Sequence, residues 1–262
     1  MDAATRWAEL MQRREEELPL DEAALVIAAH ANSTLDVAGQ LRRLDDIAAE
    51  VSRPDTASVC RVLFEQLGLR GDLQQYDDPR NSYLDQVLDR RRGIPISLSV
   101  LLIEVGRRCG LHLEGVGMPG HFLVRDTAEP DLFIDAFGGG QRLDHSGCER
   151  LLRMTTGVRM ELAPAMLATS GHRATLARML ANLDASFERR ADLQSLYWVS
   201  SLCLMIPDLP LGDRVRLARR LDGLGRFDEA ANVLEGVADT RPDSDVMAQL
   251  RAEAAALRAR LN

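Results

Sequence analysis

Lysine is absent from this chain of 262 residues, and arginine supplies all 32 of its basic side chains. An enzyme that forms a Schiff base or attacks through a side-chain amine needs a lysine, so the sequence excludes both mechanisms. Alanine and leucine are abundant. Together with the missing lysine, they indicate a coding bias toward G+C and not a function.

Cysteine is also scarce, and the four cysteines lie far apart in the sequence, at Cys60, Cys109, Cys148 and Cys203. No two of them form a CxxC pair, and no histidine stands at zinc-finger spacing from them. A disulfide framework and a structural zinc site are therefore not indicated, and we expect neither a metal nor a cofactor. Free cysteines fit a reducing compartment, which predicts a cytoplasmic protein.

Long apolar runs and an excess of positive charge are missing too. No run approaches the roughly 18 residues that span a bilayer, and the acidic N-terminus lacks the basic-then-apolar order of a secretory signal. The formal net charge is -8, whereas a general nucleic-acid surface needs concentrated positive charge. We therefore expect no membrane and no nucleic acid among the partners.

Helical periodicity dominates the first 90 residues, where Asp21 stands at a position suited to an N-cap and another helix is predicted to run from Asp55. At Gly93 the pattern changes, because the segment GIPI interrupts the helical periodicity. Ser97 then opens a strongly apolar helix that Gly110 ends in the manner of a C-cap. A helix with so few polar positions is predicted to be buried.

Short segments rich in apolar and β-branched residues follow this helix, at residues 113–118, 121–125 and 131–135, before the three glycines at 138–140. Such segments bounded by turn residues are typical of strands. They predict a small antiparallel sheet packed on the buried helix, and so an α+β core.

From about Pro164 the pattern is helical again, and Pro207 and Pro242 lie 35 residues apart, each closing a predicted helix pair. Around the second pair, Leu217, Ala230 and their neighbours follow the spacing of a tetratricopeptide repeat, in which small residues let two helices pack closely. These patterns predict two domains: residues 1–163, with helices and the small sheet, and residues 164–262, an all-α repeat region.

His121 and Asp135 are the residues of the predicted sheet best suited to chemistry. In a symmetric hairpin across the loop DTAEP, Arg125 pairs with Asp131, and His121 then faces Asp135. Directly opposed residues have Cβ atoms about 4.5–5.5 Å apart, within hydrogen-bonding reach for an imidazole and a carboxylate. The aspartate would orient the ring and leave its other nitrogen free as a base, although a purely structural pair has the same pattern.

The stretches RRGIPISLSVLLIEVGRRCGL, GVGMPGHFLVR and LFIDAFGGG, with NSYLDQVLDRR and LDEAAL before them, resemble SirB-type bacterial proteins. Those proteins join a transglutaminase-like core to C-terminal tetratricopeptide repeats. The resemblance implies a papain/transglutaminase-like core, in which a cysteine at the start of the central helix attacks an amide carbonyl. A histidine and an aspartate on successive strands assist that cysteine, and His121 and Asp135 match them.

The cysteine has no counterpart, because an ungapped comparison places the nucleophile position at Pro95. Ser97 carries the nearest hydroxyl, but two residues along a helix rotate a side chain by about 200°. Ser97 would therefore point away from the thiol position, and its simpler interpretation is an N-cap. Cys109 lies at the far end of the helix, whereas Cys60 and Cys148 each have a structural interpretation within a helix.

Two classes of function remain open. The leading hypothesis is a non-catalytic transglutaminase-like scaffold that binds another protein or a peptide, with the repeat helices contributing a groove for a partner it regulates. The alternative is an amide hydrolase or acyltransferase in which Ser97 or a water molecule replaces the thiol. In that enzyme His121 would be the general base and Asp135 would orient it.

Overall fold

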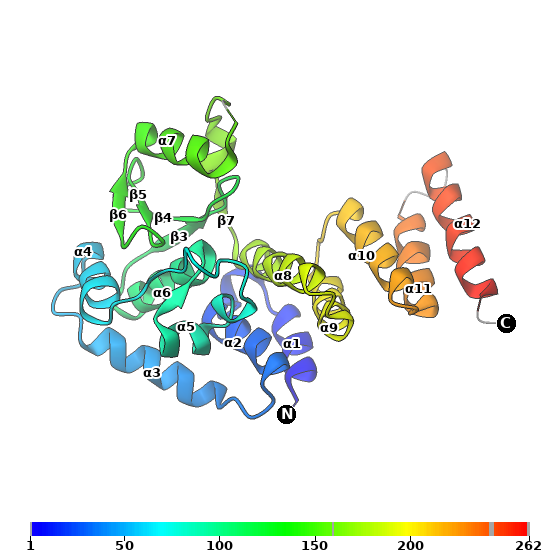
Figure 1. Ribbon diagram of the computed structural model, residues 1–262, viewed down its shortest axis with the longest axis horizontal. Coiled ribbons are helices and arrows are strands. Elements are labelled where there is room, and N and C mark those ends of the chain that lie inside the picture. The colour runs from blue at the N-terminus through cyan, green and yellow to red at the C-terminus, as the bar shows by residue number, and fades with distance from the viewer. Residues whose placement is uncertain (1, 159, 241–243, 261–262) are drawn as a thin grey trace. The chain divides into compact units, whose positions relative to one another are not determined.

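The computed structural model describes residues 2–158, 160–240 and 244–260 (Figure 1). The chain forms two compact units, Met1–Ser186 and Phe187–Asn262. The predicted boundary between residues 163 and 164 falls inside the first unit. Helix α8 (His172–Arg189) explains this difference, because Arg178 donates a hydrogen bond to the carbonyl of Met118 at 2.8 Å and Ser186 donates one to the carbonyl of Asp77.

The first unit begins with helices that surround one central helix. In chain order they are α1 (Ala3–Met11), η1 (Glu15–Glu17), α2 (Leu20–Ala31), α3 (Val37–Ala49), α4 (Thr56–Cys60), the π-helical η2 (Arg61–Gln66), η3 (Pro79–Asn81) and α5 (Leu84–Arg90). A short parallel pair of strands, β1 (Arg70–Gly71) and β2 (Arg92–Gly93), precedes the central helix α6 (Pro95–Arg108). Every residue of α6 from Pro95 to Gly106 is buried, as its apolar sequence predicted.

An antiparallel sheet of five strands follows α6, in the order β6-β5-β4-β3-β7. The strands are β3 (Leu113–Val116), β4 (Leu123–Asp126), β5 (Phe133–Asp135), β6 (Gln141–Leu143) and β7 (Thr169–Ser170). The predicted small antiparallel sheet is thus confirmed, although the sequence patterns had indicated only the three strands β3 to β5. Helix α7 (His145–Thr156) and the short η4 (Pro164–Leu167) lie between β6 and β7.

The two faces of the sheet meet different helices (Figure 1). Because side chains alternate along a strand, Leu123 and Phe133 share one face, where they pack with Cys148 and Leu152 of α7. The opposite face lies toward α6, where Ser99 donates a hydrogen bond to the carbonyl of the residue before Leu123 at 3.4 Å. The sheet is therefore a layer between α6 and α7.

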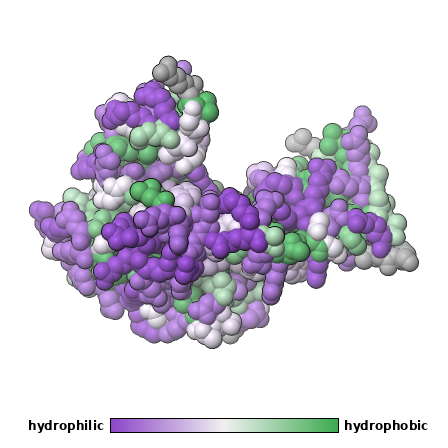
Figure 2. All heavy atoms as spheres, in the orientation of Figure 1, coloured by the Kyte–Doolittle hydropathy of each residue, from purple (hydrophilic) through white to green (hydrophobic). Residues whose placement is uncertain are grey.

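Figure 2 shows hydrophilic side chains over most of the visible face of the first unit, with a few apolar groups over the end of α7. Met154 is 74% exposed and Val158 is 54% exposed there. A second exposed apolar position is Leu73, at 84%, in the loop that follows β1. Tyr76 and Met160 are also exposed, at 47% and 38%.

The second unit is helical, with α9 (Leu193–Leu204), α10 (Leu211–Gly223), α11 (Phe227–Ala238) and α12 (Asp245–Ala259) after the end of α8. Its core includes Ala230, Ala231 and Leu234 of α11, packed with apolar residues of α10 and α12. Pro207 follows α9, whereas Pro242, on which the repeat spacing also rests, lies outside the described residues. The tetratricopeptide interpretation stays a prediction.

A cluster of charged side chains joins α2, α3 and the end of α6. Arg108 donates hydrogen bonds to Asp21 at 2.6 Å, to Asp45 at 2.7 Å and to Glu104 at 3.2 Å. Arg107 contacts the same two buried carboxylates, Asp21 and Glu104, but is 55% exposed, whereas Arg108 is 12% exposed. Asp21 is therefore not the predicted N-cap, because α2 begins one residue before it and its carboxylate faces α6.

The two buried carboxylates of this cluster have opposite pKa shifts. Burial and the neighbouring Asp21 raise the pKa of Glu104. Burial also acts to raise the pKa of Asp21, but the hydrogen bond and charge of Arg108 outweigh it, and the pKa of Asp21 is lowered. At neutral pH the cluster thus depends on Arg108 to compensate charge in a dry environment.

We predict that Arg108→Leu lowers the free energy of unfolding by about 3–5 kcal/mol, because it leaves buried carboxylates undercompensated. Arg107→Leu is the matched control and should cost about 1 kcal/mol or less, since Arg107 is 55% exposed and Arg108 still compensates both carboxylates. Urea denaturation measures both. A carboxyl with a raised folded pKa destabilises the fold above its unfolded pKa, so the Arg108→Leu deficit should shrink from about pH 7.5 to about pH 5.5. Equal losses for the two variants would contradict this account.

Candidate functional site

The His121 and Asp135 side chains meet at the edge of the sheet. Nε2 of His121 lies 2.8 Å from Oδ1 of Asp135, and the two residues are 5% and 6% exposed. The strand register differs from the predicted one, because Arg125 pairs with Phe133 and not with Asp131. A shift of two residues keeps every side chain on its original face, so the imidazole still reaches the carboxylate.

The turn after β5 fixes the carboxylate. Oδ1 of Asp135 also accepts a hydrogen bond from the backbone N–H of Phe137 at 3.0 Å, and the carbonyl of Asp135 accepts one from Gly140 at 2.9 Å. A Cβ at Gly138 would lie 2.7 Å from Oδ2, so only glycine leaves room for the carboxylate there. Glycine at position 138 is therefore required by the packing around Asp135.

The hydrogen bond also assigns the tautomer of the imidazole. An ionised carboxylate only accepts, so Nε2 of His121 carries the proton that is shared with Asp135. Nδ1 then keeps a lone pair, and it has no hydrogen-bond partner among the residues that the structure describes. This nitrogen is available to accept a proton or a hydrogen bond from a ligand or a water molecule.

Aromatic side chains extend from the pair toward the surface. The ring of Phe137 stands edge-on to His121 with 5.9 Å between centroids, and Tyr76 stands edge-on to Phe137 at 6.0 Å. Phe137 packs directly on β1, where a Cβ at Gly71 would lie 2.5 Å from the ring. Tyr76 is 47% exposed, so this row of rings connects the buried imidazole with solvent.

Helix α8 holds the loop that presents the histidine. Nη2 of Arg178 donates to the carbonyl of Met118 at 2.8 Å and to the carbonyl of His121 at 2.7 Å. Arg178, Tyr76 and Phe137 were not predicted from the sequence, since each belongs to a different element and none has a motif of its own. Only the fold brings Arg178 next to a residue 57 positions earlier.

Ser97 lies in the first turn of α6 and is not the residue that precedes the helix, as an N-cap would be. The helix begins at Pro95, and Ser97 is fully buried. Its Oγ donates to the carbonyl of Asn81 at 2.6 Å and accepts from the backbone N–H of Ile94 at 3.1 Å. The hydroxyl thus caps the helix start from inside the turn. No hydrogen bond joins Ser97 to His121 among the described residues.

Pro95 occupies the first position of α6 and is buried. Proline is favoured at this position, because its fixed φ suits the helix and its missing N–H would have no partner there. The position where the resemblance implies a nucleophile is therefore filled by a residue that suits the backbone and has no nucleophilic atom.

The cysteines are poor nucleophiles where they stand. Burial, with Asp144 and Asp135 nearby, raises the pKa of the Cys148 thiol to about 11, and Cys148 belongs to the apolar cluster under α7. Burial raises the pKa of Cys60 to about 12 and also raises the pKa of Cys109. Thiolates form less readily at all three positions than in an exposed cysteine.

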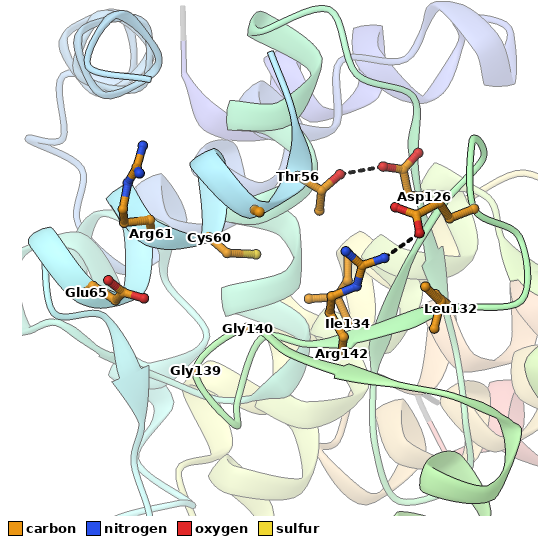
Figure 3. Close-up of a pocket in the computed structure, with 12 residues that line it drawn as sticks. Thr56, Cys60, Arg61, Glu65, Asp126, Leu132, Ile134, Gly139, Gly140 and Arg142 are labelled. Atoms are coloured by element: carbon orange, nitrogen blue, oxygen red, sulfur yellow. Dashed lines mark hydrogen bonds and ion pairs between the residues drawn. The ribbon is translucent and has the colours of Figure 1, made fainter. Parts of the chain in front are cut away.

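A separate cavity of about 200 Å³ lies between α4 and the sheet (Figure 3). Cys60 and Ile134 line it, and its rim carries the Thr56–Asp126 hydrogen bond and ion-paired Arg142. Because Ile134 and the following Asp135 point to opposite faces of β5, this cavity is on the side of the sheet away from the His121 imidazole. None of His121, Asp135 and Ser97 lines it.

The described residues contain neither a metal site nor a membrane-spanning helix. Residues 2–158, 160–240 and 244–260 contain no group of three or more His, Cys, Asp or Glu side chains placed to hold a metal ion. Within the same residues, no helix combines the length and apolar character needed to cross a bilayer.

A sheet with a histidine–aspartate pair at its edge, packed on a buried helix, is the arrangement that the sequence resemblance implied. The family model of the transglutaminase-like superfamily matches residues 30–181, which include α6, the sheet and the pair. The chain is also 39% identical over 194 residues to a UPF0162 protein of Xylella fastidiosa (strain 9a5c), covering 69% of each protein. The chain therefore belongs to the transglutaminase-like superfamily and to the UPF0162 family.

Two relatives of lower identity match a smaller share of the chain. A UPF0162 protein of Vibrio cholerae is 31% identical over 159 residues, 60% of this chain and 58% of that protein. The mouse F-box only protein 21 is 36% identical over 154 residues, which cover 52% of this chain but only 24% of the mouse protein. No solved structure matches the chain.

We predict that neutral His121 carries its proton on Nε2, as the hydrogen bond to Asp135 requires. His30 and His172 are internal controls, because their Nδ1 atoms lie 2.9 Å and 2.7 Å from the backbone carbonyls of Val26 and Leu18. These two rings should therefore be protonated on Nδ1. Long-range ¹H–¹⁵N NMR spectra of the neutral rings distinguish the tautomers.

Asp135→Ala should remove the preference of His121 for the tautomer protonated on Nε2. The tautomers of His30 and His172 should stay unchanged. If His121 instead carries its proton on Nδ1 in the unaltered protein, the geometry of the pair described above is wrong.

Proposed function

We propose that this protein is a non-catalytic member of its superfamily that binds a protein or peptide ligand through the His121–Asp135 pair. The observation that supports the proposal is the bonding of Ser97, whose hydroxyl caps the helix start and has no hydrogen bond to the imidazole among the described residues. With Pro95 at the helix start, the pair has no covalent nucleophile beside it. An imidazole with one unpartnered nitrogen still serves as a specific hydrogen-bond acceptor.

The second unit would contribute to partner binding, as in the SirB-type proteins that the sequence resembles. Support comes from the close packing of α10, α11 and α12, with small residues such as Ala230 and Ala231 between them. A cavity of about 540 Å³ within this unit is lined by Leu204, Leu211 and Arg214, among others. We propose these helices as a surface for a partner protein, and four free cysteines support a cytoplasmic location.

A second candidate is an amide hydrolase that works without a covalent intermediate. The unpartnered Nδ1 of His121 favours it, because a base in this position could deprotonate a water molecule that attacks the carbonyl. Asp135 would stabilise the imidazolium that forms. Ser97 has no part in this version of the alternative, since its hydroxyl has no hydrogen bond to the base.

An activity assay separates the two candidates. Purified protein is incubated with an N-acetylated glutamine peptide, with and without a primary amine as acyl acceptor. We predict that release of ammonia and formation of the amide adduct are equal for the unaltered protein and His121→Ala. Asp135→Asn is the accompanying control, because it removes the charge of the carboxylate but keeps the shape of the side chain. Turnover that disappears in His121→Ala would overturn the non-catalytic proposal and establish the water mechanism.

Restoring a thiol tests whether the core keeps the geometry of a cysteine enzyme. A cysteine in the first turn of a helix has a lowered pKa, especially beside an imidazole, and each unit of lowering raises the thiolate fraction at neutral pH roughly tenfold. We predict that the thiol introduced by Pro95→Cys reacts with iodoacetamide several times faster than the native cysteines do, as peptide mapping would show.

The faster reaction of the introduced thiol with iodoacetamide should be lost when His121→Ala is added to Pro95→Cys. Pro95→Ala reports the cost of removing the proline by itself. If the introduced thiol reacts at the same rate with and without His121, the pair does not face the helix start, and the residue-by-residue match with the cysteine enzymes fails.

A further inference from the structure

Arg178 has donors that the fold does not use. Its Nη2 holds the carbonyls of Met118 and His121, but Nε and Nη1 have no hydrogen-bond partner among the described residues. Arg178 is not part of any ion pair in the described part of the chain. Its guanidinium lies against the Phe122 ring at 5.5 Å from the centroid, and a Cβ at Gly117 would come within 3.1 Å of Nη1.

A partly buried cation without a counter-charge is an unusual arrangement, because charges removed from water are normally paired. Burial lowers the pKa of Arg178, and no carboxylate of the described residues offsets that effect. Arg108 is also partly buried, but it contacts three carboxylates. This contrast indicates that an anion from outside the chain completes the environment of Arg178.

We propose that Arg178 is the anchor of a carboxylate-binding subsite beside the His121–Asp135 pair, and that it recognises a carboxylate carried on an apolar body, as at the acidic or C-terminal end of a peptide. The subsite rests on the proposed function, because it names the kind of ligand that the pair would meet. Arg178 is a ligand contact in this proposal and also a positioning residue for the loop before β4.

The surroundings favour a carboxylate over a doubly charged phosphate. Arg178 brings a single positive charge to this place. A carboxylate needs one compensating charge, whereas a phosphate at neutral pH carries between one and two. The exposed ring of Tyr76, which interacts electrostatically with Arg178, offers apolar contact for the part of the ligand next to its carboxylate.

Binding of short peptides to the full-length protein tests the subsite. The probes are an acetylated Ala-Ala-Leu peptide with a free carboxylate, the same peptide as a C-terminal amide, and an amidated peptide with glutamate in the middle position. NMR titration at low salt gives the affinities. We expect the free acid to bind at least about tenfold more tightly than its amide, since a charge-assisted hydrogen bond is lost.

The glutamate peptide identifies the source of the carboxylate. If it binds as well as the free acid, side-chain carboxylates are accepted, and if it binds like the amide, the subsite is specific for a C-terminus. Equal binding of the free acid and its amide, or no binding of any of the peptides, would overturn the proposal.

Arg178→Met should abolish the preference for the free acid, whereas Arg178→Lys should keep part of it. Arg173→Met is the matched control, because Arg173 lies on the same helix and also donates to two carbonyls, those of Met11 and Arg13. The His121 tautomer, read as described above, reports whether the loop is intact in each variant. If Arg178→Met still prefers the free acid to the amide, the proposal is wrong.

His121→Ala separates this inference from the proposed function. A preference for the free acid that persists in His121→Ala and vanishes in Arg178→Met supports the subsite but contradicts binding through the pair. Weaker binding of all three peptides in His121→Ala, with the same preference in Arg178→Met as in the unaltered protein, supports the pair and rejects the subsite.

Discussion

The burial of α6 is the constraint on which the rest of the first unit depends. Every residue from Pro95 to Gly106 is excluded from water, so each polar group on this helix needs a partner inside the protein. Ser97 finds the carbonyl of Asn81, and Ser99 finds the carbonyl of Phe122. At the other end, Glu104 is satisfied by the arginines that end the helix. The hydroxyl of Ser97 is therefore used for folding.

The sequence predicted those features that follow from local patterns. The apolar run of α6 indicated burial correctly, and segments rich in apolar and β-branched residues indicated β3, β4 and β5 within a few residues. It did not predict β6 and β7, because their residues, Gln141–Leu143 and Thr169–Ser170, are mostly polar and form no apolar run. Their pairing depends on neighbours that are distant in sequence.

The contact between His121 and Asp135 was predicted correctly, although the predicted strand register was wrong. The hairpin is shifted by two residues from the symmetric arrangement, and yet His121 still contacts Asp135, because the face of each side chain is unchanged. A shift by one residue would have placed them on opposite faces. In contrast, no sequence rule points to Arg178, since its place beside His121 is set by how α8 returns to the sheet.

The presence of the pair does not by itself argue for catalysis, because Asp135 also has a structural role. Its carboxylate caps the turn through the N–H of Phe137, and its carbonyl binds Gly140, so the fold needs this residue even if no reaction occurs. Among the described residues, the fold uses neither Nδ1 of His121 nor the Nε and Nη1 donors of Arg178. These atoms are open enough to solvent to bond to water or to a ligand. One of these groups is an acceptor and the other a cation, which is the complement expected for a ligand that carries both a donor and an anion.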